Sequence, residues 1–128
     1  MVTTAAAVQQ VFDVWKRYRP RPEYCRLTAT RKKLIAARLR DYSPQDLVAL
    51  VVYANESDVA ECRFWRGQND RRAEYLDLTN LLRVQKLDGR VERALLWRDE
   101  QTAKATAEVG GLDLGAMGIL RGGNWGQA

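Results

Sequence analysis

The chain has 128 residues, of which 46% are hydrophobic and 29% are charged, and it contains two cysteines and no histidine. This length suits a single domain with one core, and the composition argues against wholesale disorder. The lack of histidine excludes Ser-His and Cys-His nucleophile pairs and imidazole general-base chemistry. We therefore expect no enzyme, no cofactor and no metal site.

Positive charge is concentrated within residues 16–40. This segment carries ten basic residues and a single acid, Glu23, whereas the rest of the chain carries eleven basic and fifteen acidic residues. The formal net charge of +5 thus conceals a strongly basic segment and a net negative remainder. Such a distribution is typical of contact with a phosphate backbone, and it also suits docking on an acidic protein. A charged face that is merely solvated is the third interpretation.

The first predicted helix spans Thr4–Arg17. Apolar residues recur there at intervals of three and four, which predicts a helix with one buried stripe. The motif Arg19-Pro20-Arg21-Pro22 ends it, because each proline disfavours the α conformation of the residue before it and lacks a backbone donor. Residues 19–26 are therefore predicted to form an extended basic connector.

A second helix, capped by a threonine, is predicted to end near Asp41, with Ile35 among its apolar positions. At 100° per residue, Arg31 and Arg38 lie on the core-facing edge of this helix. A guanidinium is tolerated there only if its stem packs and its head finds a partner. We interpret both arginines as structural, whereas Lys33 and Arg40 point the opposite way.

Ser43-Pro44-Gln45-Asp46 is the sharpest local signal in the sequence. It combines a serine N-cap, a proline at the first helical position and an acid three residues after the cap, so a helix must begin there. Its body, residues 47–54, is apolar at almost every position. This pattern predicts a central buried helix that the others surround.

Two further helical segments are predicted between residues 56 and 109. Val59, Cys62, Phe64 and Trp65 indicate a short helix before the break at Gly67-Gln68-Asn69. Trp65 either packs in the core or is exposed for a partner, and both interpretations stay open.

The last predicted helix follows Tyr75-Leu76-Asp77. Its buried side is expected to carry Leu78, Leu81, Leu82, Val84, Val91, Leu95, Leu96 and Trp97. A break or kink is predicted at Leu87-Asp88-Gly89. The stretch after Asp99 lacks large apolar residues, so it is predicted to project from the body or to fray.

Residues 110–128 contain seven of the nine glycines and isolated apolar residues such as Leu120 and Trp125. Such a segment loses too much backbone entropy to fold alone, which predicts a flexible tail over residues 109–128. Its apolar residues would dock on a partner or on a second copy, and a plain linker is the other interpretation. The fold predicted for residues 1–108 is all-α: a compact single-domain bundle of about five helices around a central buried helix.

Membrane and targeting segments are not expected. The N-terminal residues show no positively charged leader before an apolar stretch, and no run approaches the roughly 18 apolar residues needed to span a bilayer. We therefore expect a mature cytoplasmic protein without membrane contact. No Walker-type phosphate-binding motif occurs either, so nucleotide hydrolysis is not predicted.

The order of these features resembles a known family over about two-thirds of the chain. The residues that carry the resemblance are Leu27-Thr28 before Arg31, Leu34-Ile35, Arg38-Leu39, Ser43-Pro44-Gln45-Asp46-Leu47, Phe64-Trp65 with Gly67, Tyr75-Leu76 and Leu81-Leu82. They resemble the conserved C-terminal helical domain of bacteriophage replisome-organiser proteins, relatives of the DnaD-type primosomal domains. The resemblance implies a non-enzymatic adaptor in the host cytoplasm that binds DNA at a phage origin and helps to recruit the replicative helicase.

The leading functional hypothesis is a phage-type DNA replication accessory module that binds the DNA backbone, the replicative helicase or another replication protein. Phosphate contacts are assigned to the cations expected to be free, which are Arg19, Arg21, Lys32, Lys33 and Arg40. Partner contacts are assigned to Trp65, Leu120 and Trp125. Two alternatives stay open: a phage protein-only adaptor or inhibitor of a host enzyme, and a small assembly protein that forms homo-oligomers through its tail.

Overall fold

The computed structural model describes residues 3–108, in which every regular element is a helix and no strand occurs. The elements in chain order are α1 (Thr4–Arg17), the short 3₁₀ helix η1 (Pro22–Tyr24), α2 (Ala29–Arg38), α3 (Pro44–Glu56), α4 (Ala60–Trp65), α5 (Leu78–Leu81) and α6 (Val84–Glu108). The all-α prediction is confirmed, with six α-helices in the described part rather than about five.

Helix α3 is the centre of the bundle, as predicted. The Ser43 hydroxyl accepts a hydrogen bond from the Asp46 backbone N–H at 3.1 Å, and the Asp46 carboxylate accepts one from the Ser43 N–H at 3.2 Å. This reciprocal cap, together with Pro44 at the first helical position, fixes where the helix begins. All of residues 47–54 are buried, and α3 packs against α1, α4 and α6.

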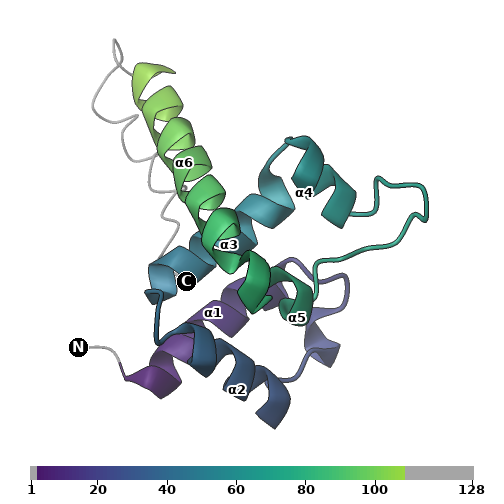
Figure 1. Ribbon diagram of the computed structural model, residues 1–128, viewed down its shortest axis with the longest axis vertical. Helices are drawn as coiled ribbons and strands as arrows, with labels where there is room; N and C mark the ends of the chain where they lie inside the picture. The colour runs from purple at the N-terminus through teal and green to yellow at the C-terminus, as the bar shows by residue number, and fades with distance from the viewer. Residues whose placement is uncertain (1–2, 109–128) are drawn as a thin grey trace.

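Helices α1 and α2 lie side by side below α3 (Figure 1). The bounds of α1 agree with the prediction, and its buried Trp15 donates its indole N–H to the Leu76 carbonyl at 2.8 Å. Helix α2 is capped by Thr28 but ends at Arg38, three residues before the predicted Asp41. It ends early because Ser43 must be extended to cap α3, with φ −74° and ψ 160°.

The predicted break at Leu87-Asp88-Gly89 is wrong: α6 continues through these residues, and the helix is interrupted earlier, at Leu82 and Arg83. Arginine side chains stabilise the interruption, because Arg38 donates to the Leu82 carbonyl and Arg90 donates to that of Asn80. Such donors satisfy carbonyls that a continuous helix would pair with its own backbone.

Two residues predicted on the buried side of this helix are instead exposed. Val84 is 59% exposed and Leu96 is 63% exposed. The buried apolar positions of α6 are Leu87, Val91 and Ala94, spaced by four and three residues, so its inward stripe leaves Val84 and Leu96 on other faces.

The last turns of α6 extend away from the other helices (Figure 1), as predicted for the stretch after Asp99. The predicted tail, residues 109–128, lies outside the described residues. Within residues 3–108, no helix is both long enough and apolar enough to cross a membrane.

Candidate nucleic-acid interface

The basic segment divides into arginines that face inward and cations that face solvent. Arg31 places its guanidinium 4.8 Å from the Trp15 ring centroid and donates to the Arg26 carbonyl at 2.7 Å. The Nε of Arg38 donates to the Leu82 carbonyl at 2.8 Å. Both side chains are therefore held by intramolecular contacts, in agreement with the structural role that the helical spacing indicates.

Arg19, which the sequence placed among the phosphate-binding cations, is not on the surface. Its side chain is only 11% exposed and forms a 2.6 Å ion pair with Glu74, while its guanidinium lies 5.3 Å from the Trp15 ring centroid. The contact partner is 55 residues away in the sequence, so Arg19 ties the connector after α1 to the segment before α5. This placement removes Arg19 from the candidate interface.

Arg21 remains exposed but already has partners. Its Nε lies 2.6 Å from the Glu23 carboxylate, and its guanidinium is 4.6 Å from the Tyr24 ring centroid. The hydrogen bond from Arg21 holds the pKa of Glu23 below its ordinary value. A phosphate at this position would have to compete with Glu23, so Arg21 is the weaker candidate on the connector.

The three remaining predicted cations, Lys32, Lys33 and Arg40, are all exposed. Among the described residues, none of their side chains takes part in an ion pair or a hydrogen bond. Helix α2 itself contains no acidic residue. Lys32 and Lys33 lie within α2, and Arg40 lies two residues beyond its end, in the turn that leads to α3. We call these three residues the α2 cations.

Two further cations in the same segment were not selected from the sequence. Arg17, at the end of α1, and Arg26, before α2, are both exposed. Arg26 donates to the Glu23 backbone carbonyl at 3.0 Å, which leaves its charge without a carboxylate partner. Both belong to the basic segment 16–40, but the sequence pattern did not show that they are exposed, because their exposure depends on how the connector folds.

Trp65 belongs to the core, so the packing interpretation describes it and the partner interpretation does not. It is 6% exposed, meets Tyr53 edge to face with ring centroids 6.4 Å apart, and lies under the Arg90 guanidinium at 4.8 Å. The other two predicted partner residues, Leu120 and Trp125, lie outside the described residues.

Glu61, Cys62 and the residues bonded to Glu61 form a structural network rather than a reactive site. Burial would raise the pKa of Glu61, but hydrogen bonds from Arg93 at 2.8 Å and from Tyr53 at 2.7 Å outweigh it and lower that pKa. Burial raises the pKa of the adjacent Cys62 thiol to about 11. An ionised carboxylate and a protonated thiol are thereby favoured at neutral pH, and neither is poised to attack a substrate.

Within residues 3–108, no cluster of three His, Cys, Asp or Glu side chains could hold a metal ion. In comparisons with protein-family models, curated proteins and solved structures, no match to this chain is found. The assignment of a function therefore depends on the residues themselves.

Proposed function

We propose that this protein is a non-enzymatic adaptor that binds the phosphate backbone of nucleic acid through the α2 cations. The observation that carries the proposal is the exposure of Lys32 and Lys33 on a helix without acidic residues, and of Arg40 just beyond its end, with no intramolecular side-chain partner among the described residues. Other arginines of the basic segment are held by carbonyls, rings or carboxylates. These three charges are not neutralised within the described part of the fold, which is what a phosphate contact requires.

Binding of this kind positions a protein on nucleic acid without reading its sequence. Flexible lysines act as point charges toward phosphates, and such contacts carry no sequence information. We therefore propose low sequence specificity and a strong dependence on salt.

The residue pattern shared with replisome-organiser domains supports a role in phage DNA replication. On that resemblance we propose a replicative helicase or another replication protein as the protein partner. The last turns of α6 extend away from the other helices (Figure 1). They would therefore stay accessible to a protein partner while the α2 cations contact nucleic acid.

A second candidate function is a protein-only adaptor, in which the same cations dock on an acidic protein surface. Exposed apolar side chains favour it: Leu96 on α6 is 63% exposed, and Val59 before α4 is 44% exposed. This candidate predicts a stable complex with a protein and no affinity for nucleic acid.

The test is fluorescence anisotropy with a labelled 20-base-pair duplex over a series of salt concentrations. The charge-reversed α2 variant, K32E/K33E/R40E, is compared with a control, R83E/K86E/K104E. The control reverses three other exposed cations that lack ion pairs among the described residues, so the two variants have the same net charge.

We expect the α2 variant to bind at least tenfold more weakly, with the slope of log K against log salt reduced in magnitude by roughly 2 to 3, since each phosphate contact contributes about 0.9. The control should keep the wild-type slope. Equal losses in the two variants, or no binding by the wild-type protein, would contradict the proposal.

A further inference from the structure

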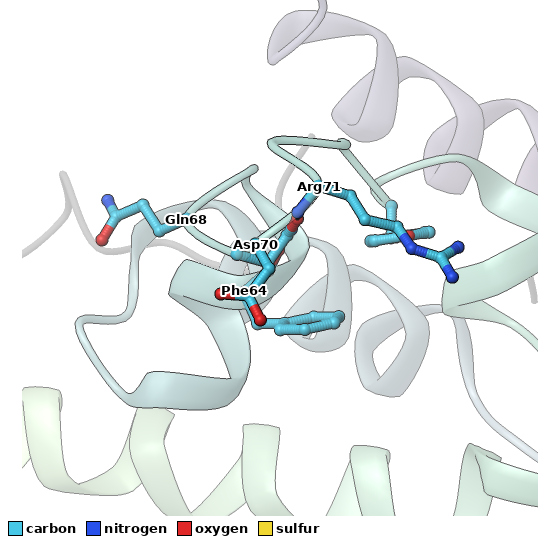
Figure 2. A pocket seen from close by; sticks show the side chains of 6 residues that line it. Phe64, Gln68, Asp70 and Arg71 are labelled. Carbon is cyan, nitrogen blue, oxygen red and sulfur yellow. The ribbon is translucent and has the colours of Figure 1, made fainter.

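A second surface, away from the α2 cations, combines an exposed aromatic stack with unpaired arginines. A hollow of about 620 Å³ is lined by Phe64, Gln68, Asn69, Asp70, Arg71 and Tyr75 (Figure 2). Phe64 is 49% exposed, and its ring lies nearly parallel to that of Tyr75, at 10° with centroids 5.6 Å apart. We call this feature the aromatic hollow.

Phe64 is exposed because the neighbouring residues of α4 take the core positions. Cys62 and Trp65 are buried, and at 100° per residue Phe64 turns away from Trp65 toward solvent. Large exposed aromatic rings are costly in water, so an open ring face beside a hollow is the kind of surface that marks a binding site.

Hydrogen bonds to backbone carbonyls hold the segments that carry the two rings together before any ligand binds. The Tyr75 N–H donates to the Trp65 carbonyl at 2.7 Å, which joins the two ends of the intervening loop. Inside the loop, the Asn69 side chain donates to the carbonyls of Phe64 at 2.7 Å and Ala73 at 2.8 Å. A platform fixed in this way loses little conformational freedom on binding.

One arginine, Arg71, and one acid, Asp70, line the hollow, and two further arginines, Arg63 and Arg72, are next to lining residues in the sequence. Arg63, Arg71 and Arg72 are exposed and make no ion pair among the described residues, whereas the nearby Glu74 is paired with Arg19. Figure 2 shows Gln68 and Arg71 extending in opposite directions, with Asp70 between them. A phosphate is therefore favoured at the arginines and disfavoured beside Asp70, whose carboxylate suits an amino or imino group.

We infer that the aromatic hollow binds an unpaired base of single-stranded nucleic acid, with the base stacked on Phe64 and the flanking phosphates on Arg63, Arg71 and Arg72. Stacking on an aromatic ring needs a base whose face is accessible, which a duplex does not offer. A phosphopeptide is a poorer fit, because Asp70 would repel a phosphate that entered the hollow.

This inference rests on the proposed function only in naming nucleic acid as the ligand, since it concerns different residues. The Arg19–Glu74 ion pair places the connector after α1 against the loop that contains the hollow, and the connector carries the exposed Arg21 and Arg26. A single strand could thus run from the hollow along the connector toward α2.

The experiment compares a labelled 15-nucleotide thymidine strand with an abasic strand of the same length, which has the phosphates and no bases. The variants are Phe64→Leu, which keeps the apolar bulk but not the aromatic face, and Phe64→Trp, which keeps an aromatic face. Val59→Ala is the matched control, because Val59 is an exposed apolar residue immediately before the same helix.

We expect the wild-type protein to prefer the thymidine strand over the abasic one, and F64L to bind the thymidine strand roughly 5- to 100-fold more weakly. F64W should restore binding, V59A should behave as wild type, and duplex binding should not change in any of them. If the wild-type protein binds both strands equally, or if F64L binds the thymidine strand as tightly as wild type, the inference is overturned while the α2 proposal stands. If K32E/K33E/R40E binds duplex as wild type and F64L loses only single strands, the α2 proposal fails and the aromatic hollow remains.

Discussion

Arg38 and Arg40 lie two residues apart at the end of α2, and the structure gives them opposite roles. Arg38 donates to the Leu82 carbonyl at 2.8 Å across 44 residues of sequence, whereas Arg40 is exposed and has no side-chain partner among the described residues. We therefore predict that replacing each with methionine, which keeps an unbranched stem, has very different effects on stability.

The magnitude follows from the lost hydrogen bond. A hydrogen bond to a charged group contributes about 1.5–3 kcal/mol, and its removal leaves the Leu82 carbonyl at the interruption between α5 and α6 without its donor. For a domain of this size each kcal/mol shifts Tm by roughly 3–5 °C, so Arg38→Met should lower Tm by roughly 5–15 °C. Arg40→Met should change the free energy of unfolding by less than about 0.5 kcal/mol.

Urea unfolding followed by tryptophan fluorescence measures both variants under the same conditions. The m-values should match that of the wild-type protein, since neither change alters the surface exposed on unfolding. Equal stabilities of R38M and R40M would refute the division of the basic segment into structural and solvent-facing cations.

Three other consequences follow from local contacts. Ser43→Ala removes the hydroxyl of the α3 cap and should lower the free energy of unfolding by about 0.5–2 kcal/mol in urea titrations, and an unchanged midpoint would show that the cap is unimportant. The pKa of Glu61 is lowered in the folded state, so its stabilising effect is complete above its ordinary value of 4.5 and is lost as the pH falls through the lower folded pKa. Thermal unfolding should accordingly show a stability gap between wild type and Glu61→Gln at pH 7 that narrows toward pH 3, and a gap that widens would contradict the sign. Cys62 is fully buried and its pKa is raised to about 11, so at pH 7.4 a maleimide should modify the half-buried Cys25 first and Cys62 only on unfolding.

Features fixed by neighbouring residues were predictable from the sequence. The Ser43-Pro44-Gln45-Asp46 cap and the apolar run behind it place α3 at the centre of the bundle, because both signals are complete within a few residues. The bounds of α1 follow in the same way from its periodic apolar stripe and the prolines after it.

Features that depend on distant partners were not predictable. Arg19 and Arg21 look alike in the sequence, but Arg19 pairs with Glu74, 55 residues away, and its side chain is 11% exposed, whereas that of Arg21 is 64% exposed. The interruption of the helix at Leu82 also depends on a distant residue, because Arg38 donates to the Leu82 carbonyl. The helix continues through Gly89, so the glycine does not mark the break. Burial of Leu87 and Val91 on either side of Gly89 offsets the roughly 1 kcal/mol that a glycine costs inside a helix.

The aromatic hollow illustrates the same limit for the candidate sites. The sequence pattern treated Phe64 and Trp65 together as members of one short helix, but their exposure differs, from 49% for Phe64 to 6% for Trp65. The difference arises because Cys62 and Trp65 take the core positions of α4. The stacking of Tyr75 on Phe64 comes from a residue beyond the helix, a contact that no local pattern encodes.

The central claim, that the exposed cations of α2 contact phosphate, is tested most directly by NMR. The ¹⁵N-labelled protein is titrated with a short duplex, and the shift of each backbone amide is recorded. The claim predicts that the largest shifts fall at Lys32, Lys33 and Arg40, with small shifts at the Lys86 and Lys104 positions of α6. Saturation with duplex that leaves the α2 amides unmoved, or shifts them no more than those of α6, would contradict it.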